Sequence, residues 1–298
     1  MNNDIKTSFS IKDLENLTGI KAHTIRIWEK RYNILKPTRT ETNIRHYDSE
    51  NLQKLLNITL LVDYGYKISK IANHDSKQLN ELVKKITSER NKNDQIINSF
   101  KISMMHFDQH LFNSTYNELL SQKTFKEIFR EILIPLIEEI GILWQTDTIT
   151  PAHEHFISHL IRQKTLSNIE SIQNNTMPAN NKVYVLLLPI NEIHELGLLY
   201  LNYELLSNGY KTIYLGQSVP TESLKHITDQ FKDITFIVYT TIEPTKDKVS
   251  EYVEHFKKVN LTNKANNLWM IGRMTSELNP SSDFKTFRGL KEILEEIK

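Results

Sequence analysis

The sequence predicts a multidomain α plus α/β protein, in which two helical parts precede a doubly wound parallel-sheet part. Short helical patterns broken by turn residues fill residues 1–75, and apolar residues at helical spacing run through 101–173 without strand-like alternation. After a polar stretch at 174–181, short apolar runs alternate with helical patterns, which is typical of a parallel sheet covered by helices. The length of 298 residues agrees with roughly two or three domains.

Composition excludes several classes of protein. Hydrophobic residues make up 39% and charged residues 24% of the chain, which favours packed domains over disorder. The chain has no cysteine, which excludes disulfides, thiolate metal sites and thiol nucleophiles. The start of the chain lacks a signal-peptide pattern, and the longest apolar run, 183–190, is far below the roughly 18 residues of a membrane span. We therefore expect a cytoplasmic protein without a membrane partner.

The N-terminal segment has the pattern of a helix–turn–helix. Ser10 can cap a helix together with Asp13, and this helix is expected to run to about Leu17. Gly19 supplies a tight turn because glycine adopts positive φ without strain. A second helix is predicted over 22–31, and in such a motif the second helix enters the major groove of DNA.

The second helix has an inward face and an outward face. Ile25 and Trp28 are three residues apart and are expected to face the core, whereas His23, Arg26 and Lys30 lie on another face. A short loop over 37–47 follows, in which Asn43 can adopt the left-handed conformation of a tight hairpin. Net charge is only +1, and residues 1–75 hold twelve Lys and Arg against nine Asp and Glu, so any nucleic-acid surface must be local.

Residues 10–47 resemble the start of MerR-type transcriptional regulators, which have a helix–turn–helix followed by a β-hairpin wing and bind DNA as dimers. The matching positions are Thr24, Arg26, Trp28, Glu29, Arg31, Tyr32, Pro37, Arg39, Arg45 and Tyr47. Asn43 stands where the family usually has glycine. The DNA-binding residues that the resemblance and the helix face imply are His23, Thr24, Arg26, Lys30, Arg31, Arg39, Arg45 and Tyr47. The alternative for each is an ordinary surface residue or, for Tyr32 and Tyr47, a core residue.

The middle of the chain predicts a helical linker and then a helix bundle. Residues 76–100 keep helical spacing at first and then pass into the polar stretch SERNKNDQ, which we expect to be a linker. Residues 101–175 predict a bundle of about four helices, with a break at 146–151. Residues 182–298 predict a doubly wound domain of about five strands. Its apolar runs cover 183–189, 212–215, 235–240 and 268–272, with helices at about 195–207, 221–231 and 245–259.

His194 is a candidate ligand-binding residue because it follows the first predicted strand of this domain. Open α/β sheets bind ligands beyond the carboxyl ends of their strands, at the point where the strand order reverses. Glu192 could accept a hydrogen bond from one ring nitrogen of His194 and so fix the tautomer that binds a metal. Gly197 has no side chain and leaves room for a bulky group. The alternative is a histidine in a surface loop with acidic neighbours.

The segment from Glu192 to Gly197 resembles the D-x-H-x-x-G signature of cobalamin-binding domains, with Glu in place of Asp. The resemblance implies a flavodoxin-like or Rossmann-like domain in which His194 is the lower axial cobalt ligand and the nucleotide tail of the cofactor enters the domain. Thr240 stands where the family has the serine of an S-x-L pattern. Gly272 and Arg273 stand where a Gly-Gly pair is usual, and the long side chain of Arg273 could obstruct the tail.

Residues 134–161 resemble the four-helix bundle that covers the upper face of cobalamin in B12-dependent MerR-type photoreceptors. The hallmark is a tryptophan followed ten residues later by Glu-His, here Trp144, Glu154 and His155. The resemblance implies that Trp144 lies over the adenosyl group, that Glu154 interacts with it, and that His155 can ligate cobalt once that group has gone. The alternative is a bundle-core tryptophan with His155 and His159 as i,i+4 neighbours. A zinc site at these two histidines lacks a third ligand in the sequence.

The assembled pattern predicts a transcriptional regulator, a repressor, that binds double-stranded operator DNA and is controlled by adenosylcobalamin bound through His194, with light as a candidate signal. We expect a homo-oligomer, a dimer or a tetramer, and no enzymatic turnover. One alternative is a regulator of the same fold that has lost the cofactor and responds to a protein partner or another ligand. The other is a corrinoid-carrier enzyme module, against which the DNA-binding head argues.

Overall fold

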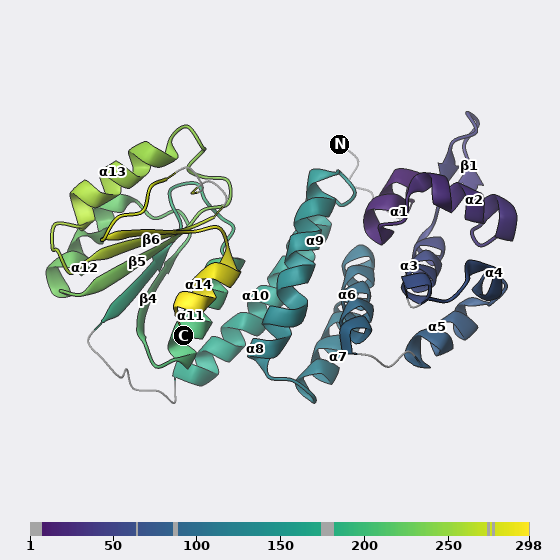
Figure 1. The fold of residues 1–298 in the computed structure, drawn as a ribbon, viewed down its shortest axis with the longest axis horizontal. Coiled ribbons are helices and arrows are strands. Elements are labelled where there is room, and N and C mark those ends of the chain that lie inside the picture. The colour runs from purple at the N-terminus through teal and green to yellow at the C-terminus, as the bar shows by residue number, and fades with distance from the viewer. Residues whose placement is uncertain are drawn as a thin grey trace. The chain divides into compact units, whose positions relative to one another are not determined.

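The computed structural model describes residues 8–63, 65–85, 89–173, 182–272, 275 and 278–297. The chain divides into two compact units, Met1–Leu160 and Ile161–Lys298. Figure 1 shows the helices and strands of both units. The polar stretch 174–181, the predicted boundary, lies outside the described residues.

The first unit begins with the predicted helix–turn–helix. Helix α1 spans Ile11–Thr18 and starts with a capping box, in which Ser10 and Asp13 exchange side-chain-to-backbone hydrogen bonds. Gly19 ends the helix with φ of 77°, the left-handed conformation that favours glycine. Helix α2 then spans Ala22–Tyr32. The predicted capping, turn and second helix are all confirmed.

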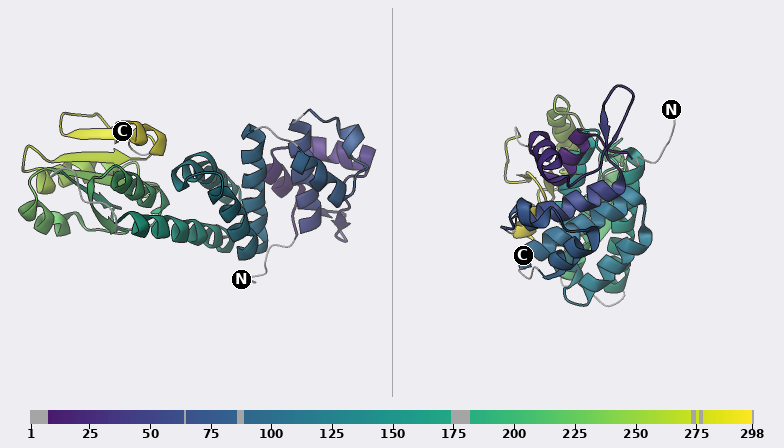
Figure 2. Two further views of the ribbon diagram at one scale, coloured as in Figure 1. Left: turned by 90° about the horizontal axis from the view of Figure 1, so that it is seen from below. Right: turned by 90° about the vertical axis from the view of Figure 1, so that its right-hand side faces the viewer.

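A β-hairpin follows the two helices and forms the wing of the head. Strand β1 (Thr38–Arg39) pairs antiparallel with β2 (Arg45–His46). Asn43 has φ of 63°, so asparagine adopts the conformation for which the family uses glycine. Figure 2, in its right-hand view, shows this hairpin projecting from the head helices as a narrow loop.

Helix α3, Ser49–Asp63, supplies much of the apolar core of the head. Its buried residues include those that predicted the helix, namely Leu52, Leu55, Leu56, Ile58 and Leu60. Two shorter helices complete the head, α4 over Ile68–Ile71 and α5 over Ser76–Lys85.

Four helical segments form the bundle that follows. The first, second and fourth are α6 (Glu89–His106), α7 (Gln109–Leu120) and α10 (Pro151–Gln173). The third, called the rod below, is one continuous helix made of α8 (Phe125–Ile128), the π-helix η1 (Phe129–Leu133) and α9 (Ile134–Gln145). The stretch SERNKNDQ, which we expected to be part of a linker, is helical where the structure describes it, because residues 89–95 are the first turns of α6. Glu, Arg, Lys and Gln are good helix formers, and the buried Ile97 and Phe100 later in α6 supply the packing that makes their helix stable.

The rod contains a π-helical turn, in which the amide of Ile134 donates to the carbonyl of Phe129, five residues earlier. Pro135 follows directly and has no amide to donate to residue 131. A lost hydrogen bond of this kind is a typical cause of a local change in helix geometry.

The second unit contains the predicted doubly wound sheet. Its strands are all parallel and lie in the order β4-β3-β5-β6-β7. Their bounds are β3 Val183–Leu187, β4 Lys211–Gly216, β5 Ile234–Tyr239, β6 Asn267–Ile271 and β7 Phe284–Phe287. The first strand of the domain, β3, is flanked by the second and the third, which is the flavodoxin-like order and places the reversal of strand order beside β3.

Helices cover both faces of this sheet, so every residue of β3 is buried. The helical elements are α11 (Leu196–Ser207), the 3₁₀ turn η2 (Thr221–Leu224), α12 (Lys225–Gln230), α13 (Val249–Asn260) and α14 (Leu290–Glu296). Figure 1 shows α12 and α13 on one side of the sheet and α11 and α14 on the other. None of the helices in the described residues has the length and apolar character needed to cross a membrane.

Candidate functional site

His194 lies in the loop between β3 and α11, at the reversal of strand order. Its side chain is 44% exposed, and its Nδ1 lies 2.5 Å from Oε1 of Glu192, whose own side chain is fully buried. The same oxygen accepts hydrogen bonds from the amides of Ile193 and His194 at 2.9 and 3.0 Å. The predicted pairing of Glu192 with His194 is therefore present, and a ring whose Nδ1–H donates to a carboxylate offers Nε2 to a metal.

The second oxygen of Glu192 holds a different loop. Oε2 accepts hydrogen bonds from the amides of Thr241, Ile242 and Glu243 at 2.9, 2.7 and 3.0 Å. One carboxylate thus joins the loop after β3 to the loop after β5. The sequence predicted only the contact with His194, because the second contact depends on which loop lies beside the first.

The hydrogen bonds determine the charge of Glu192. Burial by itself raises the pKa of a carboxyl group, but the ring of His194 and the amides of Ile242, Glu243 and His194 outweigh it and hold the pKa of Glu192 well below its ordinary value. Glu192 is therefore ionised at neutral pH and can act as a permanent acceptor for the His194 ring.

Gly197, in the first turn of α11, allows the close approach of an aromatic ring. A Cβ atom at this position would lie 2.7 Å from Cζ and 2.8 Å from the hydroxyl oxygen of Tyr239. Tyr239 is the last residue of β5, and its ring takes up the space that the sequence analysis left for a bulky group beside Gly197.

Thr240 and Gly272 form a tight backbone junction at the ends of β5 and β6. Thr240 is buried, and both its amide and its hydroxyl donate to the carbonyl of Ile271, at 2.8 and 3.0 Å. Gly272 has φ of 138°, and a Cβ atom there would lie 1.9 Å from the Thr240 carbonyl oxygen. This position therefore requires glycine. Arg273, which the sequence analysis named as a possible obstruction, lies outside the described residues.

Glu195 is a second buried acid in the His194 loop, and the sequence analysis did not identify it. Its Oε1 accepts a hydrogen bond from Nε of Arg162 at 2.5 Å, and its Oε2 accepts one from the hydroxyl of Tyr214 at 3.0 Å. Burial and the charge of Glu195 raise the pKa of Tyr214 far above its ordinary value, so this tyrosine remains a donor. Arg162 lies in the middle of α10 and in the same unit as the sheet, so the contact ties this part of the helix to the loop that carries His194.

The candidate residues of the bundle gather at one end of the first unit. Trp144 is in the last turn of α9, and Glu154 and His155 are in the first turns of α10. Trp144 is 46% exposed, which differs from the buried position expected of a bundle-core tryptophan. The side chain of His155 is 65% exposed, and its Nε2 lies 3.4 Å from Oε2 of Glu154. Ser158 donates a hydrogen bond to the other carboxylate oxygen of Glu154 at 2.7 Å.

The predicted DNA-binding residues of α2 lie on one helix face. His23, Arg26 and Lys30 are exposed there, as is Arg31, while Thr24 is half-buried. Ile27 is 44% exposed on the same face, and the sequence analysis did not single it out. An exposed isoleucine among cations suits a major groove, where thymine methyl groups alternate with polar base edges.

The wing residues differ in their surroundings. Arg39 is exposed and donates to the side chain of Asn43 at 2.6 Å. Arg45 and Tyr47 both donate to Glu29 of α2, at 2.9 and 2.8 Å. Tyr47 is buried, which is the core position of the alternative interpretation and is unsuited to a contact with DNA.

Comparison with known proteins identifies the two parts that these residues occupy. Residues 9–77 match the model of the MerR HTH family regulatory protein, and residues 96–165 match that of the B12 binding domain. The chain joins a MerR HTH domain to a B12-binding domain. The matched B12-binding segment is the helix bundle, and it contains Trp144, Glu154 and His155.

Two relatives from Myxococcus xanthus extend over most of the chain. The HTH-type transcriptional repressor CarH is 28% identical over 227 residues, which are 73% of each protein. The HTH-type transcriptional repressor CarA is 24% identical over 217 residues, 72% of this chain and 70% of CarA. Among solved structures, the Methanosarcina barkeri monomethylamine corrinoid protein covers 68% of this chain and 93% of its own, with a TM-score of 0.52 at 12% identity. That likeness shows a shared fold.

Proposed function

We propose that this protein is a transcriptional repressor that binds operator DNA through its MerR HTH domain and is controlled by a corrinoid, adenosylcobalamin. The observation that carries the proposal is the Glu192–His194 pair at the reversal of strand order, with Nδ1 engaged by a buried carboxylate. The matched B12-binding segment and the two repressor relatives support it.

The donor set fits a corrinoid better than a free metal ion. A corrin ring supplies four nitrogen ligands to its cobalt, so the protein would have to provide no more than one or two further ligands. In the described residues, no group of three or more His, Cys, Asp or Glu side chains could hold a metal ion by itself. His194 would ligate the cobalt through Nε2, and in the bundle the exposed Trp144 and His155 and the half-buried Glu154 are the residues that would contact the cofactor.

Control of DNA binding then follows from different stabilities of two states. Bound adenosylcobalamin would supply a light-sensitive cobalt–carbon bond, and Trp144 and Glu154 would hold its adenosyl group and so would favour one arrangement of the bundle. In a dimer or tetramer, two heads bind two half-sites, so a change in assembly changes DNA affinity without a new protein–DNA contact. The proposed contact residues are His23, Thr24, Arg26, Lys30, Arg31, Arg39 and Arg45.

The test is an absorption spectrum of the purified protein after mixing with adenosylcobalamin in the dark and desalting, followed by illumination. We expect a retained corrinoid spectrum that changes on illumination and is lost in His194→Ala. Retention without dependence on His194 would contradict the ligand assignment. A colourless wild-type protein would contradict cofactor control altogether.

One observation favours a second candidate, a regulator of the same fold that does not bind cobalamin and responds to a protein partner or another ligand. The Tyr239 ring lies against Gly197, where a cofactor would need room. Tyr239→Ala separates the two proposals in the same desalting experiment. Retention of corrinoid by the variant alone would support the second candidate, whereas retention by the wild type would exclude it.

A further inference from the structure

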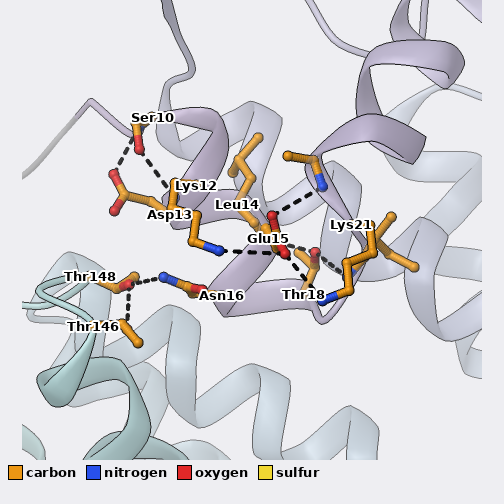
Figure 3. Close-up of polar contacts among 12 residues, drawn as sticks. Ser10, Lys12, Asp13, Leu14, Glu15, Asn16, Thr18, Lys21, Thr146 and Thr148 are labelled. Atoms are coloured by element: carbon orange, nitrogen blue, oxygen red, sulfur yellow. Dashed lines mark hydrogen bonds and ion pairs between the residues drawn. The ribbon is translucent and has the colours of Figure 1, made fainter.

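The first unit contains a polar contact between the DNA-binding head and the Trp144 end of the bundle. Nδ2 of Asn16, in α1, donates to the hydroxyl oxygen of Thr148 at 2.9 Å. The hydroxyl of Thr146 lies 2.9 Å from the same oxygen, as Figure 3 shows. Thr148 is fully buried and Asn16 is half-buried, so removing this hydrogen bond takes a partner from a buried hydroxyl and costs more than removing a surface contact.

The backbone connects Thr148 directly to the turn that carries Trp144. The amide of Thr148 donates to the carbonyl of Leu143 at 2.9 Å, and the amide of Asp147 donates to the carbonyl of Trp144 at 3.0 Å. Asp147 has φ of 52°, in the left-handed region. These two hydrogen bonds and this conformation make a Schellman motif at the end of α9. Thr148 therefore moves together with the last turn of that helix.

A second set of hydrogen bonds also joins α1 to α9. Lys101 of α6 is buried, and its Nζ donates to the carbonyl of Leu17 at 3.3 Å and to Oε2 of Glu139 at 2.9 Å. Leu17 is at the end of α1, where carbonyl groups lack partners within the helix and a cation is favourable. Glu139 belongs to α9. The end of α1 is thus joined to α9 both through Thr148 and through Lys101.

We propose that these contacts transmit the state of the Trp144 end of the bundle to the DNA-binding head. A change in the last turn of α9 shifts Thr148, Thr148 shifts Asn16 in α1, and α1 is joined to the recognition helix α2 by the short turn at Gly19. Asn16, Thr148 and Lys101 are positioning residues in this scheme. The inference rests on the function proposed above and adds a route within a single chain from the cofactor-binding end to DNA.

The first test uses hydrogen exchange of the cofactor-free protein. Asn16→Ala should accelerate exchange of the amides at 146–150, and Thr148→Val should accelerate exchange of the amides at 15–19. Each rate should rise by about three- to tenfold, which is the change expected from the loss of one or two hydrogen bonds. The matched control is Thr124→Ala, which removes a helix cap elsewhere in the bundle and should leave both segments unchanged. If each substitution accelerates only its own segment, the two sites are not coupled and the proposal fails.

The second test compares DNA affinity before and after illumination of the adenosylcobalamin-loaded protein, on a duplex selected from a random pool. In Asn16→Ala and Thr148→Val, the ratio of the two affinities should move toward one by about three- to tenfold, whereas Thr124→Ala should keep the wild-type ratio. A merely structural role would lower stability and leave the ratio unchanged, which would overturn the proposal. If the wild-type chain retains no corrinoid, the proposed function fails, and hydrogen exchange still decides whether the head and the bundle are coupled.

Discussion

Replacing Glu192 with glutamine would test the arrangement that holds His194. In the wild-type chain, one carboxylate oxygen accepts from the ring and amide of His194, and the other accepts from three amides over 241–243. A glutamine of nearly the same volume offers one carbonyl oxygen and one NH2 group. In either orientation, the NH2 group of the glutamine faces N–H donors, either those of His194 or those of residues 241–243.

The magnitude follows from the charge and from the number of bonds. Hydrogen bonds to a charged group contribute about 1.5–3 kcal/mol each and neutral ones about 0.5–1.5 kcal/mol, and buried donors left without acceptors add a penalty. We therefore expect Glu192→Gln to lower the free energy of unfolding of the sheet domain by about 2–4 kcal/mol. Trp269 is buried in β6, so its fluorescence during urea unfolding reports this domain when Trp28 and Trp144 are changed to Phe.

A matched control exists on the surface of the same domain. Glu222 pairs with His255 at 2.7 Å, with side chains 66% and 48% exposed. Glu222→Gln should change the free energy of unfolding far less than Glu192→Gln does, because solvent screens an exposed pair. Equal effects of the two substitutions would refute the reasoning, since burial and the backbone contacts of Glu192 would then contribute nothing.

Three further predictions concern other parts of the chain. Gly272→Ala should lower the free energy of unfolding of the sheet domain, measured in urea, by about 2–5 kcal/mol, because the new Cβ atom has no space. Gly141→Ala, in an open helical position, should raise the free energy of unfolding by about 0.5–1 kcal/mol. Burial and nearby negative charges raise the pKa of Tyr184 to about 12, so the stability that its neutral form contributes is present below pH 10 and lost as the pH rises to about 12. Thermal unfolding should therefore show less alkaline destabilisation for Tyr184→Phe. Glu29→Gln removes the charged partner of Arg45 and Tyr47, and should weaken DNA binding in fluorescence anisotropy by about tenfold or less, with no change in corrinoid retention.

The features of the fold that local chemistry determines could be read from the sequence. Ser10 and Asp13 cap α1, Gly19 ends it, and Asn43 forms the hairpin turn, each as predicted. The helix over 89–95 was harder to predict, because polar residues with good helix propensity resemble a loop until their packing partners are known.

The candidate site was predictable only where its contacts are local. The Glu192–His194 contact joins residues two apart, and the sequence predicted it. The contacts of Glu192 with residues 241–243 join two loops about fifty residues apart, and no periodicity reports such a pair. The ring of Tyr239 beside Gly197 escaped prediction for the same reason.

The π-helical turn at Phe129–Leu133 has a consequence for the direction in which Trp144 points. A π turn holds one residue more than an α turn, and one residue corresponds to about 100° of rotation about a helix axis. Because the π turn absorbs its extra residue locally, deleting one residue from it would restore a regular α-helix and leave Trp144 in about its present orientation. A residue inserted or deleted elsewhere in α9 before Trp144 has no such turn to absorb it and would rotate the tryptophan by about 100°. A change of chain length that would redirect this exposed aromatic side chain is therefore tolerated only at the π turn.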